Sequence, residues 1–466
     1  MPNPTLAARS ADLATDLYTK ELARPHSSLA DIDLNTDRFP YLQSLGFKYL
    51  NRPVLLQQRQ VDSFGDDLLQ LAGLLTTIHE RLFDGDLTLL CQDLGIPEAH
   101  ARLMCRTGAR RSPLFGRVDT YDDGESLKIL EFNASSDTGG LHWTTSVSEA
   151  LLEFPQFRAY ADTHGLRHID TLGLLVDNLR DAAAHVSTDR DDPVIAIIEG
   201  PGGLEEYGHL AWIPLNEKLR ERGLDSHVGE ITDLRLHRGR IHLGDRRVDL
   251  VYRVFEMEQV VHDPEALSRT EDLLSAYEEG HVALWTPPET EAFRNKRCMT
   301  YLSDPLMRSH LTPEEARIID RRLPWTRSLT GPASLTESEF SDRLLEDREH
   351  LILKPDDGFD GRGIVRGWET DENTWRQALQ EAADHGRAVV QKRIVPITEE
   401  ALDPLTGHNV EWQTCWGFYY FPTGFGGGRG RMVPVGSHSD VYYKEPLLAG
   451  LFTHPGHPQP TEDPRP

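Results

Sequence analysis

Hydrophobic and polar positions along the chain change their period several times, and each change predicts a different kind of element. Through most of residues 1–112 the apolar positions recur at helical spacing, with an amphipathic run from Asp66 to Phe83. Two short runs follow, Leu114 to Tyr121 and Leu127 to Phe132, and both are typical of strands. Asp122-Asp123-Gly124 between them favours a tight reversal of the chain. We therefore expect an antiparallel hairpin.

An α/β pattern follows a helix expected over about residues 144–164. A helical run from Asp170 to His185 precedes the apolar run Pro193 to Glu199, which is typical of a buried parallel strand. A helix over about residues 205–222 and a strand from Val248 to Val254 complete the unit. The glycines that follow Glu199 lack the G-x-G-x-x-G spacing, so the sequence does not predict a dinucleotide site here.

The last third of the chain begins with helices and ends with strands. A strand is expected at Val282 to Trp285, with further helices to about residue 346. Strands and turns dominate after Leu351. The end is rich in proline and poor in apolar residues, so we expect a disordered tail over residues 451–466.

Composition excludes some classes of function. The chain has 466 residues, enough for two or three domains, and a formal net charge of −26, which disfavours nucleic acid as a partner. No apolar run is long enough to span a membrane, and no secretory signal is visible at the start. The four cysteines are scattered without a C-x-x-C pair, as expected for reduced thiols. We therefore expect a cytoplasmic protein.

The expected hairpin carries the first candidate site. Side chains alternate across a strand, so Arg117 and Asp119 share one face of the first strand, and Glu131 and Asn133 share one face of the second. If the register brings these faces together, two carboxylates and an amide oxygen converge, and such hard ligands suit Mg²⁺. A hairpin with a solvated polar face explains the same pattern.

A second candidate site lies in the glycine-rich segment after Leu353. Lys354 ends an apolar strand, and Gly358, Gly361 and Gly363 follow before the next strand begins. Glycines let backbone N–H groups approach an anion, and a lysine at the edge of the loop supplies a charge for phosphate. The segment is not a P-loop, because the G-x-x-x-x-G-K-[ST] order is absent. A flexible hairpin loop with a solvated lysine is the alternative.

Three other places carry weaker signals. Gln391 and Lys392 interrupt an apolar strand whose edge could present backbone groups to an adenine. Lys296 follows the Pro287-Pro288 break and would be a second phosphate ligand, although it could equally be an exposed lysine on a helix. Arg431 lies in a glycine-rich stretch and is either a phosphate or carboxylate contact or an arginine in a flexible loop.

The order of these motifs resembles the ATP-grasp ligases in their circularly permuted form, in particular the glutathionylspermidine-synthetase-like branch. The likeness covers roughly residues 110–440, and no amidase domain is present. It implies an α/β (α+β) fold: a circularly permuted ATP-grasp fold with a Rossmann-like pre-grasp substrate domain and a helical N-terminal region. The implied segments are that helical region (1–112), the hairpin part of the grasp domain (113–165), the Rossmann-like substrate-side domain (166–265), the ATP-binding lobes (266–450) and the disordered tail (451–466).

The resemblance also implies a role for each candidate residue. Asp119, Glu131 and Asn133 would bind Mg²⁺. Lys296, Lys354, Gly358, Gly361, Gly363, Gln391 and Lys392 would bind ATP. Ser135, Ser136, Thr138 and Arg253 would contact the substrate, and Arg117, Glu258 and Arg431 would be catalytic.

The implied activity is ATP-dependent ligation of a small-molecule or peptide carboxylate to an amine, through an acyl phosphate and with release of ADP and phosphate. Peptide or small-molecule biosynthesis is the expected setting, and a homodimer is the expected assembly. Two alternatives remain open at this point: a nucleotide-binding scaffold without catalysis, and an ATP-grasp kinase that transfers phosphate without ligation.

Overall fold

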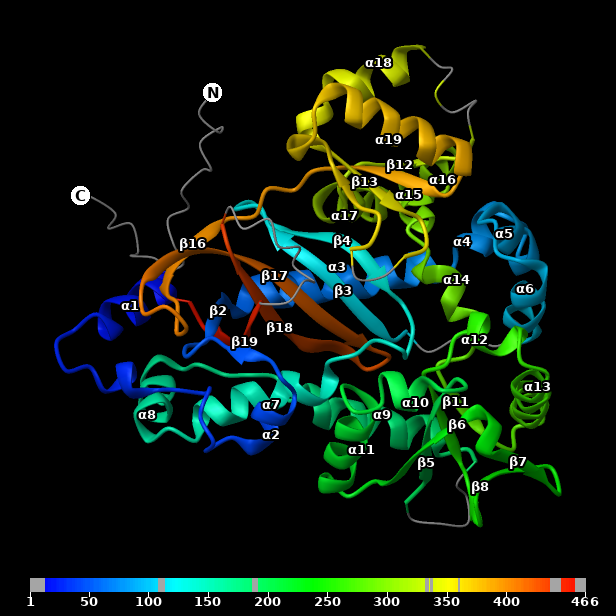
Figure 1. The fold of residues 1–466 in the computed structure, drawn as a ribbon, viewed down its shortest axis with the longest axis horizontal. Helices are drawn as coiled ribbons and strands as arrows, with labels where there is room; N and C mark the ends of the chain where they lie inside the picture. Colours follow the sequence, from blue (N-terminus) through cyan, green and yellow to red (C-terminus); the bar gives the residue numbers. More distant parts are fainter. Residues whose placement is uncertain are drawn as a thin grey trace, which may run out of the picture.

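The computed structural model describes residues 13–107, 114–186, 192–331, 335, 338–358, 361–435 and 446–456. Within these residues the strands form three sheets of four or more strands and one small three-stranded sheet, β7-β8-β9. Helices surround the sheets (Figure 1). The described part of the chain is therefore a mixed α/β structure, as the sequence predicts.

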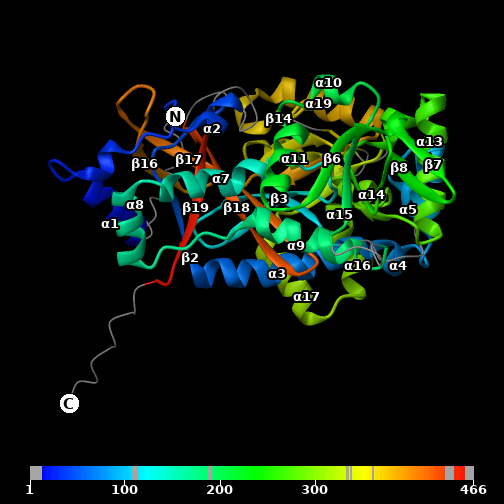
Figure 2. The same ribbon diagram turned by 90° about the horizontal axis from the view of Figure 1, so that it is seen from below.

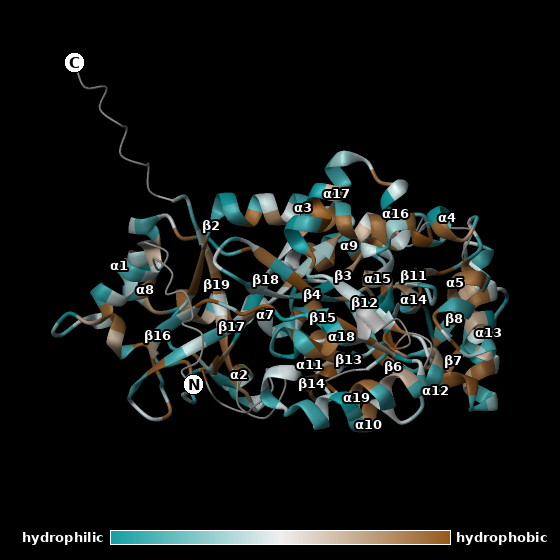
Figure 3. Cartoon of the chain, turned by 90° about the horizontal axis from the view of Figure 1, so that it is seen from above, coloured by the Kyte–Doolittle hydropathy of each residue, from teal (hydrophilic) through white to brown (hydrophobic). Residues whose placement is uncertain are grey.

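The largest sheet joins both ends of the chain to the hairpin. Its order is β1-β19-β18-β17-β3-β4, with β2 paired to β19 and β16 paired to β17. Helices α3 and α7 lie on its two sides (Figure 2), and α3 shows both apolar and polar residues (Figure 3). The bounds are β1 (Lys48–Tyr49), β2 (Val54–Gln57), α3 (Gln58–Thr76), β3 (Gly116–Asp122), β4 (Leu127–Asn133), α7 (Leu141–Leu152), β16 (Thr398–Leu402), β17 (Asn409–Phe421), β18 (Gly424–Pro434) and β19 (Leu447–His454).

Strand β19 corrects the expected start of the tail. Residues 451–454 belong to this strand, which pairs in parallel with β2. Leu451 and Phe452 are buried against the core, so these two apolar side chains keep the strand in the sheet despite the prolines that follow. Residues 457–466, the rest of the expected tail, lie outside the described residues.

The second sheet is parallel, with the order β11-β10-β5-β6. Alternate side chains of β5 enter two different apolar clusters: Ile195 and Ile197 pack with α9, and Ala196 and Ile198 with the cluster that contains α13. Both faces are therefore covered, as the continuous apolar run predicts. The bounds are α9 (Thr171–Ala183), β5 (Val194–Glu199), α11 (Trp212–Glu221), β6 (Asp225–Glu230), β7 (Leu234–His237), β8 (Arg240–Leu243), β9 (Arg246–Arg247), β10 (Leu250–Arg253), α13 (Pro264–Glu278) and β11 (Ala283–Trp285).

The third sheet carries Lys354 and the glycine-rich loop. Its order is β12-β15-β13-β14, all antiparallel, and the loop joins β13 to β14. Trp375 and Leu379 of α19 pack on this sheet. The bounds are β12 (Thr326–Leu329), α18 (Ser338–Glu346), β13 (Leu351–Pro355), β14 (Val365–Arg366), α19 (Glu372–His385) and β15 (Ala388–Lys392).

Short helices connect these layers. They are α1 (Leu13–Leu22), α2 (Pro40–Ser44), α4 (Ile78–Leu82), α5 (Leu87–Asp93), α6 (Glu98–Met104), α8 (Pro155–His164), α10 (Gly203–Glu206), α12 (Met257–Val261), α14 (Thr290–Arg294), α15 (Arg297–Ser303), α16 (Pro305–Ser309) and α17 (Pro313–Arg322). The N-terminal region is mainly helical, although it also contributes β1 and β2 to the large sheet. Among the described helices, none is long and apolar enough to cross a membrane.

Candidate active site

The register of the β3–β4 hairpin brings the expected polar faces together. Arg117 pairs with Asn133 across the two strands, and Asp119 pairs with Glu131. Directly opposite residues of an antiparallel pair project from the same face of a sheet. The two carboxylates, the amide and the guanidinium therefore converge, and the condition left open by the sequence is met.

Asp119 lies between two arginines at the centre of this face. It is fully buried, and its two carboxylate oxygens accept hydrogen bonds from Nε of Arg117 at 2.9 Å and from Nη2 of Arg431 at 3.0 Å. Arg431 comes from β18, so a residue more than 300 positions away completes the hairpin site. Two guanidinium groups thus hold the Asp119 carboxylate inside the protein, and binding of a cation by this carboxylate stays a prediction.

Two lysines reach the hairpin from outside it. Nζ of Lys296 lies 3.4 Å from Oε2 of Glu131 and donates to the carbonyl oxygen of Gly358 at 2.8 Å. Nζ of Lys354 donates to Oε1 of Gln391 at 2.8 Å and to the carbonyl of Leu130 at 3.3 Å. Burial lowers the pKa of Lys354 to about 8, although Glu131 raises it in part. The structure thus brings both predicted phosphate lysines to the β4 strand.

A cleft opens between the hairpin and the glycine-rich loop. Its lining residues are Glu131, Phe132, Asn133, Arg294, Lys296, Asp356, Asp357 and Gly358. Nδ2 of Asn133 is buried and has no hydrogen-bond partner among the described residues, so contacts from these residues to this nitrogen do not hold the amide group in one orientation. Of the three predicted metal ligands, Glu131 and Asn133 line the cleft, whereas Asp119 is fully buried and is not among the lining residues. A carboxylate and an amide oxygen are hard donors of the kind that Mg²⁺ prefers.

The glycine-rich loop is described on both sides of a short gap. Gly361 and Gly363 have φ angles of +70° and +73°, a conformation that residues with a Cβ rarely adopt, so the turn itself requires these glycines. Gly358 contributes its carbonyl oxygen to Lys296. Phe359 and Asp360 lie outside the described residues.

The side chain of Gln391 makes its contacts inside the protein. It is buried, with Oε1 on Lys354 and Nε2 on Oγ1 of Thr326 at 3.1 Å. These contacts fix the Lys354 ammonium. Lys392 is exposed, and its backbone N–H donates to the carbonyl of Trp325 at 2.8 Å. An adenine contact by this strand stays a prediction.

Arg253 is held by a buried network of protein contacts. Its guanidinium donates to the carbonyl oxygens of Thr286 and Phe255 at 2.8 and 2.6 Å and to Oγ of Ser135 at 3.1 Å, and it forms an ion pair with Glu291. The hydroxyl of Ser136 donates to the carbonyl of Arg253 itself. These contacts hold the loop after β4 against the ends of strands β10 and β11.

The small hydroxyl residues of this loop are therefore already engaged within the protein. Thr138 donates to the carbonyl oxygen of Ser135 at 2.8 Å, and Ser136 exchanges hydrogen bonds with Thr286. Ser135, Ser136 and Arg253 are each at most 1% exposed. Their contacts indicate that they position the loop, and contact with a substrate stays a prediction.

Glu256, two residues before the expected Glu258, is the glutamate that reaches the cleft side. Both of its carboxylate oxygens accept hydrogen bonds from Arg294 at 3.0 Å, and Arg294 also donates to Asp137 at 2.7 Å. Burial raises the pKa of Glu256 to about 7, with a further contribution from Asp137. Glu258 instead lies exposed on α12 beside His100 and His262.

The sequence interpretation missed Asp137, Glu256, Arg294 and Arg429. Arg429 lies two residues before Arg431, so strand alternation puts both on one face of β18, a signal that was available. Its guanidinium lies 4.1 Å from the centroid of the Trp143 ring and donates to the hydroxyl of Tyr419 at 2.9 Å. Burial lowers the pKa of Arg429 to about 9. Asp137 lies between the predicted residues Ser136 and Thr138, and Arg294 lies two positions before the predicted Lys296.

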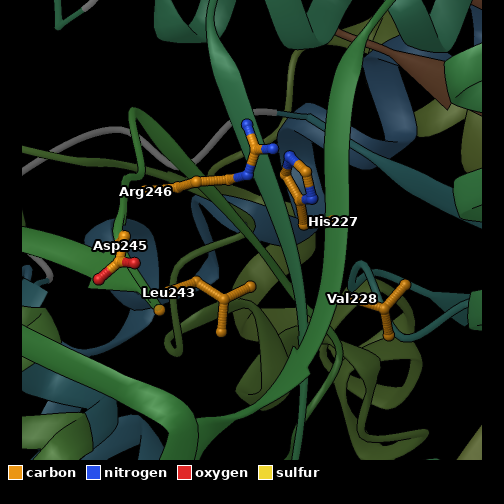
Figure 4. Close-up of a pocket in the computed structure, with 6 residues that line it drawn as sticks. His227, Val228, Leu243, Asp245 and Arg246 are labelled. Atoms are coloured by element: carbon orange, nitrogen blue, oxygen red, sulfur yellow. The ribbon is translucent and has the colours of Figure 1, made fainter.

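A second hollow lies elsewhere, beside strand β6 (Figure 4). His227 and Val228 of β6 line it together with Leu243 and the turn at Gly244, Asp245 and Arg246. None of the residues expected from the sequence lines this hollow.

The fold and the site together define the class of the protein. The carboxylate-bearing hairpin faces Lys354, from strand β13 of another sheet, and Lys296, which lies between helices α14 and α15. This mixed α/β architecture is that of the ATP-grasp proteins. The structure of a glutathione synthetase-like effector from Globodera pallida matches it with a TM-score of 0.54 at 13% identity. The match covers 90% of this chain and 95% of that chain. The expected fold class is thereby confirmed.

The family follows from the sequence. The family model for the glutathionylspermidine synthase preATP-grasp domain matches residues 34–309, more than half of the chain. The chain therefore belongs to this family, as the motif order indicated. An uncharacterized protein of Mycobacterium leprae is 23% identical over 289 residues, which cover 59% of this chain and 46% of that protein. The chain thus spans less than half the length of this curated relative.

Proposed function

We propose that the protein is an ATP-dependent carboxylate–amine ligase that forms an amide bond through an acyl phosphate. The observation that carries this proposal is the approach of two ammonium groups to strand β4: Lys296 lies 3.4 Å from Glu131 at the edge of the cleft, and Lys354 donates to the carbonyl oxygen of Leu130. Phosphoryl transfer depends on positioning and on charge compensation for the transferred group, and this set of side chains can supply both.

Asp119, Glu131 and Asn133 would hold Mg²⁺ in this proposal. The ion would neutralise charge on the nucleotide phosphates, and the ammonium groups of Lys296 and Lys354 would add to that neutralisation. The glycine-rich loop would cover the phosphates and exclude water, which protects a phosphorylated carboxylate from hydrolysis.

Three buried arginines support a second, anionic subsite. Arg117 and Arg431 donate to the carboxylate of Asp119 on the face of the large sheet, and Arg429 lies near the same carboxylate. Guanidinium groups suit the carboxylate substrate and the oxyanion that forms when the amine attacks the acyl phosphate. Arg117 and Arg431 would then be the catalytic arginines. We also propose that the chain divides into domains at the segment boundaries that the resemblance implies.

Release of ADP distinguishes this function from its alternatives. The full chain is incubated with ATP, Mg²⁺ and pairs drawn from a panel of carboxylates and a panel of amines, and ADP is measured by a coupled assay. The ligase requires both partners for ADP release. A kinase releases ADP with one partner alone, and a scaffold releases none above the Glu131→Gln variant, which serves as the background control.

A further inference from the structure

A cluster of metal-ligand side chains lies away from the cleft, where the N-terminal region meets the parallel-sheet region. His100 lies on α6 and Glu258 on α12, and His262 is the C-cap residue that follows α12. The two helices are more than 150 residues apart in sequence and lie side by side (Figure 1). His100 is buried, whereas Glu258 and His262 are exposed.

The geometry of this cluster is close to that of a metal site. Nε2 of His100 lies 3.3 Å from one carboxylate oxygen of Glu258, and Nε2 of His262 lies 3.7 Å from the other. All three ligand atoms lie within 4.8 Å of one another. Ligands about 2.0–2.2 Å from a tetrahedral Zn²⁺ are separated by roughly 3.3–3.6 Å, so only a small closure would be needed.

We propose that His100, Glu258 and His262 bind a divalent transition-metal ion of the Zn²⁺ type. Zn²⁺ accepts a set of two imidazoles and one carboxylate. Mg²⁺ prefers oxygen ligands, so the two imidazole nitrogens disfavour it. Ion pairing alone is a weak reason for this convergence, because exposed pairs contribute little to stability. With three protein ligands, water fills the fourth position.

The bound ion cross-links two segments that are distant in sequence. Its ligands lie on α6 and at both ends of the short helix α12, whose N-cap residue is Glu256. Glu256 in turn holds Arg294 beside the cleft. The site is therefore structural: it fixes the orientation of α12 and touches no reacting atom. The proposal is independent of the proposed function.

Zinc binding by the metal-free protein tests this site directly. The untagged full chain is treated with a chelator, dialysed, and titrated with Zn²⁺ in the presence of excess Mg²⁺, which occupies hard-oxygen sites. We expect saturation at one Zn²⁺ per chain. His262→Ala and Glu258→Gln each alter an exposed side chain, so both should fold, and each should weaken the affinity at least about tenfold. Circular dichroism checks the fold of each variant.

His227→Ala is the matched control. His227, which lines the second hollow (Figure 4), forms a comparable contact with a carboxylate, 2.7 Å from Asp225, but it belongs to no cluster of three ligands among the described residues. This variant should bind Zn²⁺ as the wild type does. The proposal is overturned if the wild type shows no saturable binding, if both His262→Ala and Glu258→Gln bind as tightly as the wild type, or if His227→Ala weakens binding equally.

Discussion

Lys354 offers a quantitative test of the cleft. Its side chain is buried, and burial lowers the pKa of its ammonium group from 10.5 to about 8. That difference corresponds to about 3 kcal/mol between the charged and neutral forms. Between pH 8 and about 10.5 the unfolded chain therefore binds more protons than the folded chain, and this residue makes the folded state relatively more stable as the pH rises through that window.

Nucleotide phosphates prefer the charged form of this lysine, so binding should depend on pH. At pH 9 only about one tenth of the Lys354 side chains carry a proton, and the dissociation constant of ADP should rise about tenfold between pH 7 and pH 9. The phosphates of ADP are already ionised over this range, because their last pKa is about 6. Calorimetry at several pH values measures the effect.

Two measurements isolate Lys354 from the other groups. The chain has eight lysines, so labelling with lysine that carries ¹³C at Cε gives at most eight signals to titrate by NMR. One signal should titrate near pH 8 and vanish in Lys354→Arg. The arginine also keeps its charge at pH 9, so this variant should lose most of the pH dependence of ADP binding. The reasoning fails if Lys354 titrates with the exposed lysines, or if wild-type affinity is constant from pH 7 to pH 9.

Three further predictions concern the hairpin face. Glu131→Gln should weaken Mg²⁺ binding in the presence of ADP about 10- to 100-fold, measured by calorimetry, with an unchanged circular dichroism spectrum. Arg117→Lys keeps the charge but loses the paired contacts of the guanidinium, Nε on Asp119 and Nη1 on the carbonyl oxygen of Gly139, so kcat for ADP release should fall about 100-fold. Gly417→Ala puts a Cβ 3.1 Å from Cδ of Arg117, so the Arg117 side chain must shift and the folded state should lose about 1–3 kcal/mol, measured by urea denaturation.

Gly73→Ala is the matched control for Gly417→Ala. Gly73→Ala adds a Cβ on helix α3 with no atom within 4 Å, so it should leave activity unchanged and change stability by less than about 1 kcal/mol. If Gly417→Ala behaves like Gly73→Ala, the arginines are not tightly packed on this face. Wild-type Mg²⁺ affinity in Glu131→Gln would remove Glu131 from the ligand set, and an unchanged kcat in Arg117→Lys would show that the reaction does not need the guanidinium geometry at this position.

The hairpin site was predictable because strand alternation and a tight turn are local properties. Arg117, Asp119, Glu131 and Asn133 lie within 17 residues, and only the register had to be seen in the structure. The approach of Arg431 depends on a pairing between β17 and β3 that no local pattern contains.

Two arrangements around the predicted residues could not be derived from the sequence, because they depend on where a strand ends and on strand register. The strand β10 ends at Arg253 and α12 begins at Met257, so Glu256 caps the helix and faces Arg294, whereas Glu258 turns outward. The sequence did not show where the strand alternation stops. Gln391 was predictable as a polar residue in an apolar strand, but its hydrogen bond to Lys354 depends on the β13–β15 register.

The central claim is that ATP activates a carboxylate as an acyl phosphate before an amine attacks it. The direct measurement uses a carboxylate substrate that carries ¹⁸O at both carboxylate oxygens. This substrate is chosen from a pair that supports ADP release, and the phosphate product is analysed by mass spectrometry. We predict one ¹⁸O atom in each phosphate that is released, together with an amide that has lost that oxygen. Phosphate without ¹⁸O from the carboxylate, alongside continued release of ADP, would contradict the account.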